Sequence, residues 1–449
     1  MKLKKLWIQN YMNFYDTTIV FNNEYNVEFQ KNIFKRMNVI LFSGQNGSGK
    51  TSIVSFIAKI FRYLQRYRER LTSDYLITYE IMVNGKIQEI TIMKKREDIF
   101  LKVNNEQLYL KKYNLTKKAY EENLNIKKYR QVDYTEIKTF LPSIIAVYGF
   151  DTSYADLGYA PKYKGDRIVK YTSLDEYYDT SAIGKFISKG IVLFYYRYYN
   201  NKRLRSILKE IGIELIDYVD IYENIDQYNG KYEENETEFL KSGISCYLIK
   251  KTKDCNNKLN IKEYIKKKSN YEKIKKLVDL KIIYINDFYI KKNGNAIPIS
   301  KMSTGEKIFL FGLFSLLTNI KENGIYIWEE PETHLNVNWA RNLIPILVEL
   351  LNRHNILLLL TSHNTYMIKC LFNNQIFIVK KNEIKQVNFN TFLANDSEIN
   401  NRLFDSNNSD LFENDLIQYM KKCDIYEKKE LMNVLGESYL KFMLFKMME

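Results

Sequence analysis

The chain opens with two short stretches in which apolar and polar residues alternate, a pattern typical of paired β-strands. They cover residues 3–9 and 17–21 and flank a turn-like segment at residues 12–16. An apolar run at residues 39–42 then stops at Ser43, as a buried strand does where it leads into a turn. The first forty residues are therefore predicted to form strands.

A helix and then an antiparallel sheet are predicted to follow. Apolar residues recur at helical spacing on one face of residues 51–71. Residues 75–110 alternate with a period of two, and Asn84-Gly85 is a typical hairpin turn. Strands return after residue 282, with a second hairpin turn at Asn293-Gly294.

The middle and the end of the chain have other patterns. Residues 151–280 alternate between tyrosine-rich and lysine-rich segments, and only residues 191–196 form an apolar, strand-like run. We interpret this part as an inserted, mostly helical module. Two buried strands are predicted at residues 325–328 and 356–360, with a helix between them that contains residues 339–351. Roughly the last sixty residues are predicted to be helical and charged.

Composition excludes several classes of protein. The 449 residues are 45% hydrophobic and 27% charged, which is too apolar for general disorder. No apolar run approaches the ~20 residues of a membrane span, and the N-terminus lacks the apolar region of a signal peptide. The four cysteines have no C-x-x-C spacing, which argues against a disulfide framework or a zinc site. A cytoplasmic protein without a membrane partner is expected.

The net charge of +15 has two interpretations. A basic protein can bind nucleic acid, so double-stranded DNA is one candidate partner. The chain is also rich in Asn, Ile and Tyr and contains five prolines, which is typical of an AT-rich genome that inflates the lysine count. The net charge alone favours neither interpretation over the other.

Residues 44–51, with the sequence GQNGSGKT, match the phosphate-binding P-loop pattern G-x-x-x-x-G-K-[ST]. The glycines would let consecutive backbone N–H groups curl around phosphate oxygens, next to the positive end of the following helix. Lys50 is expected to reach the β- and γ-phosphates of ATP, and the Thr51 hydroxyl is expected to bind Mg²⁺. The predicted nucleotide-binding residues of this segment are Gly44, Asn46, Gly47, Ser48, Gly49, Lys50, Thr51 and Ser52.

Two adjacent carboxylates, Glu329 and Glu330, end the predicted strand at residues 325–328. Phosphoryl transfer needs one acid to hold Mg²⁺ and another to orient and deprotonate the attacking water. Because side chains alternate along a strand, two adjacent residues point in different directions, which suits two separate tasks. We assign Glu329 to the metal and Glu330 to the water.

Two weaker signals lie on either side of this pair. Residues 303–306 (STGE) open an apolar helix as a capping box from Ser303 to Glu306, and they could also bind phosphate in the manner of a helix N-terminus. His363 follows the strand at residues 356–360, and a third parallel strand would place it at the same sheet edge as the P-loop. His334 is close to the acidic pair, whereas His354 is expected to be exposed to solvent without a further role.

In this order, the motifs resemble those of the ATP-binding-cassette (ABC) class of ATPases. Residues 44–51 resemble Walker A, residues 303–306 the signature motif, residues 325–330 Walker B, residues 331–336 the D-loop, and His363 the switch histidine. In that class two heads sandwich two ATP molecules. The resemblance implies that Ser303, Gly305 and Glu306 of one head complete the ATP site of the other, in a homodimer or a higher oligomer.

The expected fold is an α/β, two-lobed ABC-type ATPase head. It has a mixed sheet with a P-loop core and an antiparallel subsheet, and it carries an inserted, mostly helical module and a helical C-terminal tail. The expected parts are lobe I with Walker A (1–150), the inserted module (151–280), lobe II with the signature motif, Walker B and the histidine (281–390), and the tail (391–449).

Two further stretches narrow the resemblance. Residues 6–14 are similar to the RecF and chromosome-maintenance (SMC) branch rather than to transporters. Residues 329–335 (EEPETHL) are similar to the E-E-P-E-x-H-L of the overcoming-lysogenisation-defect (OLD) ATPases and of their relatives in anti-phage systems of the Septu, PARIS and AbiL types and in some retrons. Glu329 stands where most cassettes have Asp, and no Q-loop glutamine can be assigned.

OLD nucleases carry a Toprim nuclease domain after the ATPase. Here 86 residues follow His363, without the carboxylate pattern of that domain and without a His-Asn-His pattern. We therefore expect an ATPase of a defence system that controls a separate nuclease or toxin subunit, with ATP and Mg²⁺ as cofactors. The alternatives are a RecF-like repair ATPase that acts directly on DNA, and a scaffold that binds ATP with little turnover.

Overall fold

The structure is a computed structural model that describes most of the chain. The described residues are 1–25, 27–66, 71–114, 119–149, 169–173, 180–223, 258–280, 282–292, 294–381, 383–404, 411–435 and 439–448. The end of the predicted helix at residues 67–71 falls partly outside these ranges, and so do Asn293 of the second hairpin and much of the predicted module at residues 151–280. The chain divides into two compact units, Met1–Leu393 and Ala394–Glu449.

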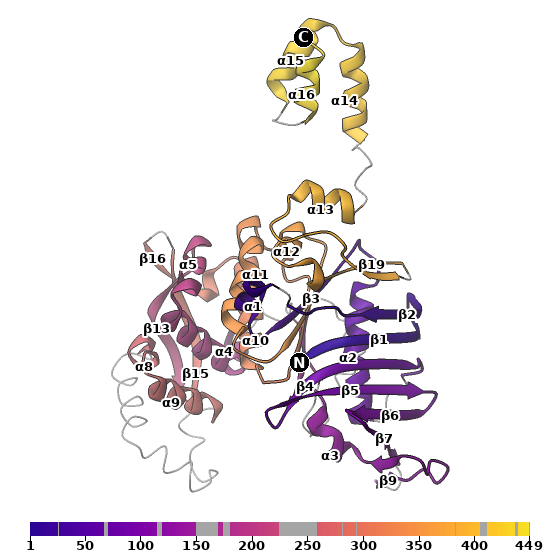
Figure 1. Ribbon diagram of the computed structural model, residues 1–449. Coiled ribbons are helices and arrows are strands. Elements are labelled where there is room, and N and C mark those ends of the chain that lie inside the picture. Colours follow the sequence, from indigo (N-terminus) through magenta and orange to yellow (C-terminus); the bar gives the residue numbers. More distant parts are fainter. Residues whose placement is uncertain are drawn as a thin grey trace. The chain divides into compact units, whose positions relative to one another are not determined.

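A mostly parallel sheet forms the centre of the first unit (Figure 1). Its strands are, in spatial order, β12 (Val169–Ser173), β11 (Ile145–Gly149), β17 (Ile325–Glu329), β18 (Leu357–Ser362), β3 (Asn38–Ser43), β19 (Ile376–Lys380) and β20 (Glu383–Gln386). All neighbours pair in parallel except β19 and β20. Strands β3, β17 and β18 are almost entirely buried, which explains why each is an apolar run rather than an alternating one.

A second, mainly antiparallel sheet lies beside it. Its strands are β10 (Arg130–Val132), β7 (Glu106–Leu110), β6 (Asp98–Val103), β5 (Lys86–Lys95), β4 (Tyr75–Val83), β1 (Lys2–Tyr11) and β2 (Phe14–Val20). Asn84 and Gly85 both have positive φ between β4 and β5, as a two-residue hairpin turn requires. The shorter elements that follow are β8 (Lys112–Asn114), β9 (Ala119–Glu121) and α3 (Tyr134–Ile137).

Helix α2 (Lys50–Arg66) joins the two sheets in one core. Its apolar face at Ile53, Phe56 and Ile60 is fully buried in a cluster that contains residues of β3 and of the antiparallel strands. The predicted mixed sheet with an antiparallel subsheet is therefore confirmed.

One element in the first forty residues differs from the prediction. Residues Glu28–Phe34 form helix α1 rather than a strand. Its buried positions, Gln30 and Phe34, are four residues apart, as on one face of a helix. The Gln30 amide donates to Asn374 Oδ1 over 2.9 Å. A buried glutamine gives no apolar signal, so the helical spacing was not visible in the sequence.

The described part of the insertion combines helices with a third sheet. The helices are α4 (Thr180–Asn200), α5 (Lys202–Glu210), α8 (Ile261–Ile265) and α9 (Lys268–Asp279). The sheet has the strand order β14 (Lys258–Asn260), β13 (Glu214–Glu223), β15 (Ile283–Lys292) and β16 (Asn295–Pro298). The antiparallel pair of β15 and β16 agrees with the strands predicted after residue 282. Strands β13 and β14 were not predicted, because they lie in the part of the chain where only residues 191–196 form a strand-like apolar run.

The strand-like reading of residues 191–196 was wrong, because these residues belong to α4. Val192, Phe194 and Tyr195 are all buried, so the helix has apolar residues on more than one side. One of these sides packs against α10 (Thr304–Thr318), where a Cβ on Gly190 would lie 1.9 Å from the Phe314 carbonyl oxygen. A short run that is apolar on all sides cannot be assigned to strand or helix by periodicity.

The remaining elements follow the predicted pattern. Helix α11 (Val337–Leu351) lies between β17 and β18 in sequence, and α12 (Thr365–Ile368) follows β18. The second unit consists of α13 (Asp396–Leu403), α14 (Leu411–Lys422), α15 (Ile425–Val434) and α16 (Tyr439–Lys446), which confirms a helical tail. Within the described ranges, no helix is both long and apolar enough to cross a membrane.

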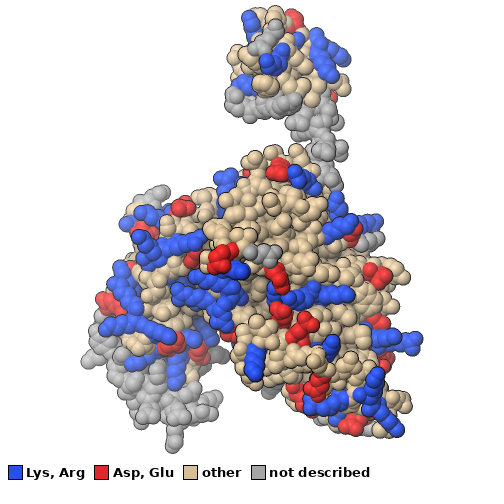
Figure 2. All heavy atoms as spheres, viewed as in Figure 1, with Lys and Arg blue, Asp and Glu red and all other residues tan. Residues whose placement is uncertain are grey.

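Charge is spread unevenly over the surface. On the face drawn in Figure 2, Lys and Arg side chains gather over the insertion, with Asp and Glu side chains between them. Lys266, Lys267 and Lys268, at the start of α9, are all exposed.

Candidate functional site

Three neighbouring parallel strands end at the same edge of the central sheet. Glu329 of β17 pairs with Thr361 of β18, and Ser362 of β18 pairs with Ser43 of β3. Glu330, His363 and Gly44 are the next residues after these strand ends. The strand order β17-β18-β3 therefore brings the three predicted motifs together at the edge where ligands of parallel sheets bind.

The P-loop lies between β3 and α2 and is tightly packed at both ends. A Cβ on Gly44 would lie 2.3 Å from the carbonyl oxygen of Val379 in β19, and one on Gly49 would lie 2.9 Å from the Phe14 ring. Gly47 has a φ of +77° at the exposed tip of the loop. Asn46 and Thr51 are exposed, whereas Ser48 and Ser52 are partly buried.

Lys50 is 6% exposed and its ammonium group folds back onto the loop. Nζ donates to the carbonyl oxygens of Gly44 at 3.0 Å and Gln45 at 3.2 Å. It also lies 3.7 Å from Glu330 Oε1. These partners hold the ammonium at the loop, where phosphate oxygens could replace the carbonyl groups.

The two carboxylates occupy different environments. Glu329 is the last residue of β17 and is 7% exposed, while the Glu330 side chain is 36% exposed. Glu330 has a φ of +39°, and its backbone N–H donates to the carbonyl oxygen and the Oγ1 of Thr361. This local turn directs the Glu330 carboxylate toward the P-loop lysine and toward His363, whose Nδ1 lies 3.6 Å from Glu330 Oε1.

The signature residues form the N-terminus of α10. Ser303 is the N-cap, and its backbone N–H and its Oγ–H both donate to Glu306 Oε2, at 3.1 and 2.9 Å. Burial raises the pKa of Glu306, but bonds from Lys292, at 2.8 Å, and from Ser303 outweigh it, so that the pKa lies below its usual range. A Cβ on Gly305 would lie 2.3 Å from the carbonyl oxygen of His334, which follows the acidic pair. The exposed side chain of Ser303 thus lies at the same end of α10 as the Gly305–His334 contact.

Sequence reasoning missed three residues beside this site. The Asn13 amide, in the turn between β1 and β2, donates to the Gly47 carbonyl oxygen over 3.4 Å. Glu332 is buried, which raises its pKa, and its carboxylate accepts a hydrogen bond from the Ser362 hydroxyl. Glu332 belongs to the EEPETHL motif, but the motif does not show what its side chain contacts. An isolated Asn or Ser has no spacing signal, so only the folded backbone shows these contacts.

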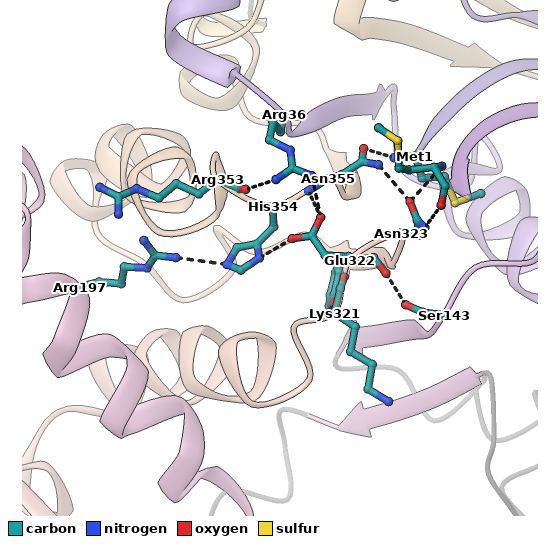
Figure 3. A network of polar contacts seen from close by, with 12 residues as sticks. Met1, Arg36, Ser143, Arg197, Lys321, Glu322, Asn323, Arg353, His354 and Asn355 are labelled. Carbon is teal, nitrogen blue, oxygen red and sulfur yellow. Dashed lines mark hydrogen bonds and ion pairs between the residues drawn. The ribbon is translucent and has the colours of Figure 1, made fainter. Parts of the chain in front are cut away.

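The expectation that His354 is simply solvent-exposed was wrong. His354 Nδ1 lies 3.0 Å from Glu322 Oε1, and Nε2 lies 3.2 Å from Arg197 Nη2 of α4 (Figure 3). Burial lowers the pKa of His354. Because the Arg197 guanidinium can only donate, the neutral tautomer with its proton on Nδ1 fits both partners. This network joins the insertion to the segment before β18.

The residues present fit an ATP–Mg²⁺ complex. The backbone at Gly44 and Gly49 is packed so closely that a side chain would not fit, and the buried Ser48 Oγ has no hydrogen-bond partner among the described residues. A hydroxyl at Thr51 and a carboxylate at Glu329 are the oxygen ligands that Mg²⁺ prefers. The Lys50 ammonium supplies the positive charge that a triphosphate needs.

Several known proteins are similar to this chain over most of its length. The family model described as "AAA domain, putative AbiEii toxin, Type IV TA system" matches residues 39–369. Among solved structures, the SMC head domain from Thermotoga maritima has 15% sequence identity and a TM-score of 0.38, over 87% of this chain and 100% of that one. An SMC head bound to the C-winged helix domain of ScpA has 11% identity and a TM-score of 0.39, over 87% and 98% of the two chains.

A third similar structure is the SMC head domain with an extended coiled coil, bound to the C-terminal domain of ScpA derived from Pyrococcus furiosus. It has 13% identity and a TM-score of 0.37, over 87% of this chain and 96% of that one. No curated protein matches the chain. The family model spans the P-loop, the signature residues, the acidic pair and His363. The chain therefore belongs to this family of AAA domains.

Proposed function

We propose that this chain binds ATP with Mg²⁺ and hydrolyses it. The observation that carries the proposal is the convergence of Lys50, Glu330 and His363 at one sheet edge, with Glu330 Oε1 3.7 Å from the lysine and 3.6 Å from the histidine. A cation, a carboxylate and an imidazole around one point are the groups that phosphoryl transfer to water requires.

Each residue has a distinct task in this mechanism. Lys50 exchanges its loop carbonyl partners for the β- and γ-phosphates, and the loop N–H groups bind the remaining oxygens. Thr51 and Glu329 would hold Mg²⁺, which neutralises charge that develops on the phosphates. Glu330 orients the attacking water and accepts its proton, while His363 donates a hydrogen bond to the γ-phosphate.

The ATP site is completed by a second copy of the chain. Ser303 is exposed at a capped helix N-terminus, which favours binding to an anion on another molecule. We infer that Ser303 and Gly305 of one head contact the γ-phosphate bound by the other, and that ATP joins the two heads.

The cellular role that fits best is in anti-phage defence. The description of the matching family names the AbiEii toxin and a type IV toxin–antitoxin system. We propose that ATP binding between paired heads senses infection and controls a separate nuclease or toxin subunit, which docks on the inserted module (151–280) or on the tail (391–449). The same description also suits a chain that is itself the toxin, and the identity of the bound partner distinguishes the two cases.

Two variants test the enzymatic part of the proposal. Lys50→Ala removes the phosphate-binding cation, so ATP binding should be lost. Glu330→Gln keeps the shape of the side chain, so binding should remain while hydrolysis falls by at least about 100-fold. Binding is measured by calorimetry with ATP and Mg²⁺, and hydrolysis by phosphate release. Normal turnover by Glu330→Gln would show that another group is the base.

A second candidate function, a RecF-like repair ATPase, is favoured by the exposed lysines at the start of α9. Affinity purification of the tagged Glu330→Gln protein from its native cells, with ATP present, separates the alternatives. A stoichiometric protein with nuclease or toxin motifs supports the defence role. DNA without such a protein supports repair. If neither a protein partner nor DNA co-purifies, the result supports a scaffold that holds ATP.

A further inference from the structure

A buried carboxylate lies directly behind the site and has no task in the mechanism above. Glu332 is 7% exposed, two residues after Glu330. One of its oxygens accepts the Ser362 hydroxyl proton, and the other, Oε2, is buried without a hydrogen-bond partner among the described residues. Burying a carboxylate is costly unless its bonds compensate, so a protein keeps one where it has a function.

Ser362 links this carboxylate to the backbone on both sides of His363. Its hydroxyl donates to Glu332 and accepts the backbone N–H of Asn364 over 2.9 Å. The hydroxyl therefore bridges the residues before and after the histidine. The Asn364 side chain in turn accepts the N–H of Tyr366 over 2.8 Å and caps α12.

His363 itself has little packing to hold it in place. Its side chain is 52% exposed, whereas Ser362 is completely buried. The direction of the imidazole therefore depends on the backbone turn, and that turn depends on the Glu332–Ser362 hydrogen bond. Displacing a reacting group by even about 1 Å can reduce a rate by about 100-fold.

We propose that Glu332 is a positioning residue that holds His363 toward Glu330 through Ser362. The inference rests on the proposed function, because it assigns Glu332 a role in ATP hydrolysis. It extends that function to a residue that touches neither nucleotide nor water.

The test compares Glu332→Ala, Glu332→Gln and Ser362→Ala. Glu332→Ala and Ser362→Ala each break the hydrogen bond, so kcat should fall by about tenfold while the KM for ATP changes by less than about twofold. Glu332→Gln keeps an oxygen that accepts the serine proton, so it should retain most of kcat. If Gln is as slow as Ala, the charge of Glu332 matters and the positioning role is wrong.

A double variant tests whether the effect passes through the histidine. If it does, Glu332→Ala combined with His363→Ala should be no slower than His363→Ala alone. If the double variant loses the product of the two single-variant reductions in kcat, the inference is overturned. Ser362→Ala removes a single hydroxyl and keeps the strand intact, so the comparison remains informative if Glu332→Ala does not fold.

A measurement without hydrolysis separates this inference from the proposed function. The chain contains three histidines, so ¹³C-labelled histidine gives three imidazole signals that substitutions can assign. Glu332→Ala and Ser362→Ala should both shift the His363 signal, Glu332→Gln should shift it less, and the His354 signal should stay in place. If the wild type does not hydrolyse ATP but these shifts occur, the proposed function fails and the positioning holds. An unmoved His363 signal overturns the positioning.

Discussion

Two glycines of the P-loop show why residue type alone does not define a site. Gly44 is confined, because a Cβ would lie 2.3 Å from the Val379 backbone oxygen and 2.9 Å from Ser48 Oγ. Gly47 is open, because no atom lies within 4 Å of the position of its Cβ. Its φ of +77° is the reason for glycine there. The motif has the same letter at both positions, but Gly44, with a φ of +157°, is constrained by space as well as by conformation, whereas Gly47 is constrained by conformation only.

This difference predicts unequal effects of alanine. Gly44→Ala must push the loop away from β19, which should cost about 2–3 kcal/mol of unfolding free energy and most of the ATP affinity. Gly47→Ala places a side chain in a left-handed conformation without a steric clash, which should cost only about 1–2 kcal/mol of unfolding free energy. Urea unfolding and ATP calorimetry of the pair would check this, and a greater loss in Gly47→Ala would contradict it.

The sequence predicted the positions of those site residues that follow from motif spacing or from the ends of buried strands. Lys50 is fixed by the P-loop pattern, and the strand-end positions of Glu330 and His363 follow from two buried strands. The positive φ of Glu330 and the Glu332–Ser362 bond were not predictable, because both depend on how β17 and β18 end relative to each other.

At the scale of elements, the prediction depended on how many faces of an element are buried. The alternating hairpin of β4 and β5 and the one-sided helix α2 have a clear period, and both were predicted. Helix α4 has buried residues on several sides and was misread in part as a strand. Strand β13 of the insertion pairs with β15 across register shifts, which weaken the alternation along β13.

The contact between α4 and the segment before β18 predicts a dependence of stability on pH. Burial lowers the pKa of His354, so the unfolded chain binds a proton there more readily than the folded one. Stability from this residue is therefore complete above its unfolded pKa and is lost as the pH falls below it. Glu322 and Arg197 contact its two ring nitrogens, and Arg36 lies on the other side of Glu322 (Figure 3).

The variant His354→Gln keeps a polar group but removes the titration. Between about pH 7.5 and 5.5, the wild type should lose more unfolding free energy than the variant does. Burial also lowers the pKa of the Met1 amino group, to about 5, which adds a loss of the same sign in both proteins. The difference between the two urea-unfolding series therefore isolates His354. Parallel series would show that His354 does not couple folding to pH.

At the scale of the whole molecule, the proposal of paired heads divides each ATP site between two copies of the chain. Walker A, Glu330 and His363 meet at the carboxyl edge of the central sheet, whereas Ser303 lies exposed at the start of α10. The proposal of paired heads gives a second task to Ser303, which caps α10 and is exposed. In a symmetric pair each of the two sites takes its base from one copy and its serine from the other.

Mixing two inactive variants tests this arrangement. Ser303→Arg should block the contact with the partner's nucleotide, and Glu330→Gln should remove the base, so each variant alone should be inactive. In a mixed pair, one site combines the intact Glu330 of the first chain with the intact Ser303 of the second, while the other site carries both lesions. With equal amounts and free exchange, half of the pairs are mixed and each has one good site, so about a quarter of the wild-type rate should return.

The control uses a double variant that carries both Glu330→Gln and Ser303→Arg in one chain. Mixing that double variant with inactive Glu330→Gln leaves no site with an intact base, so no activity should return. Differently tagged chains that purify together establish that exchange has occurred. If the tags exchange and the first mixture stays inactive, each head must complete its own site. The exposed serine would then serve only as the cap of α10.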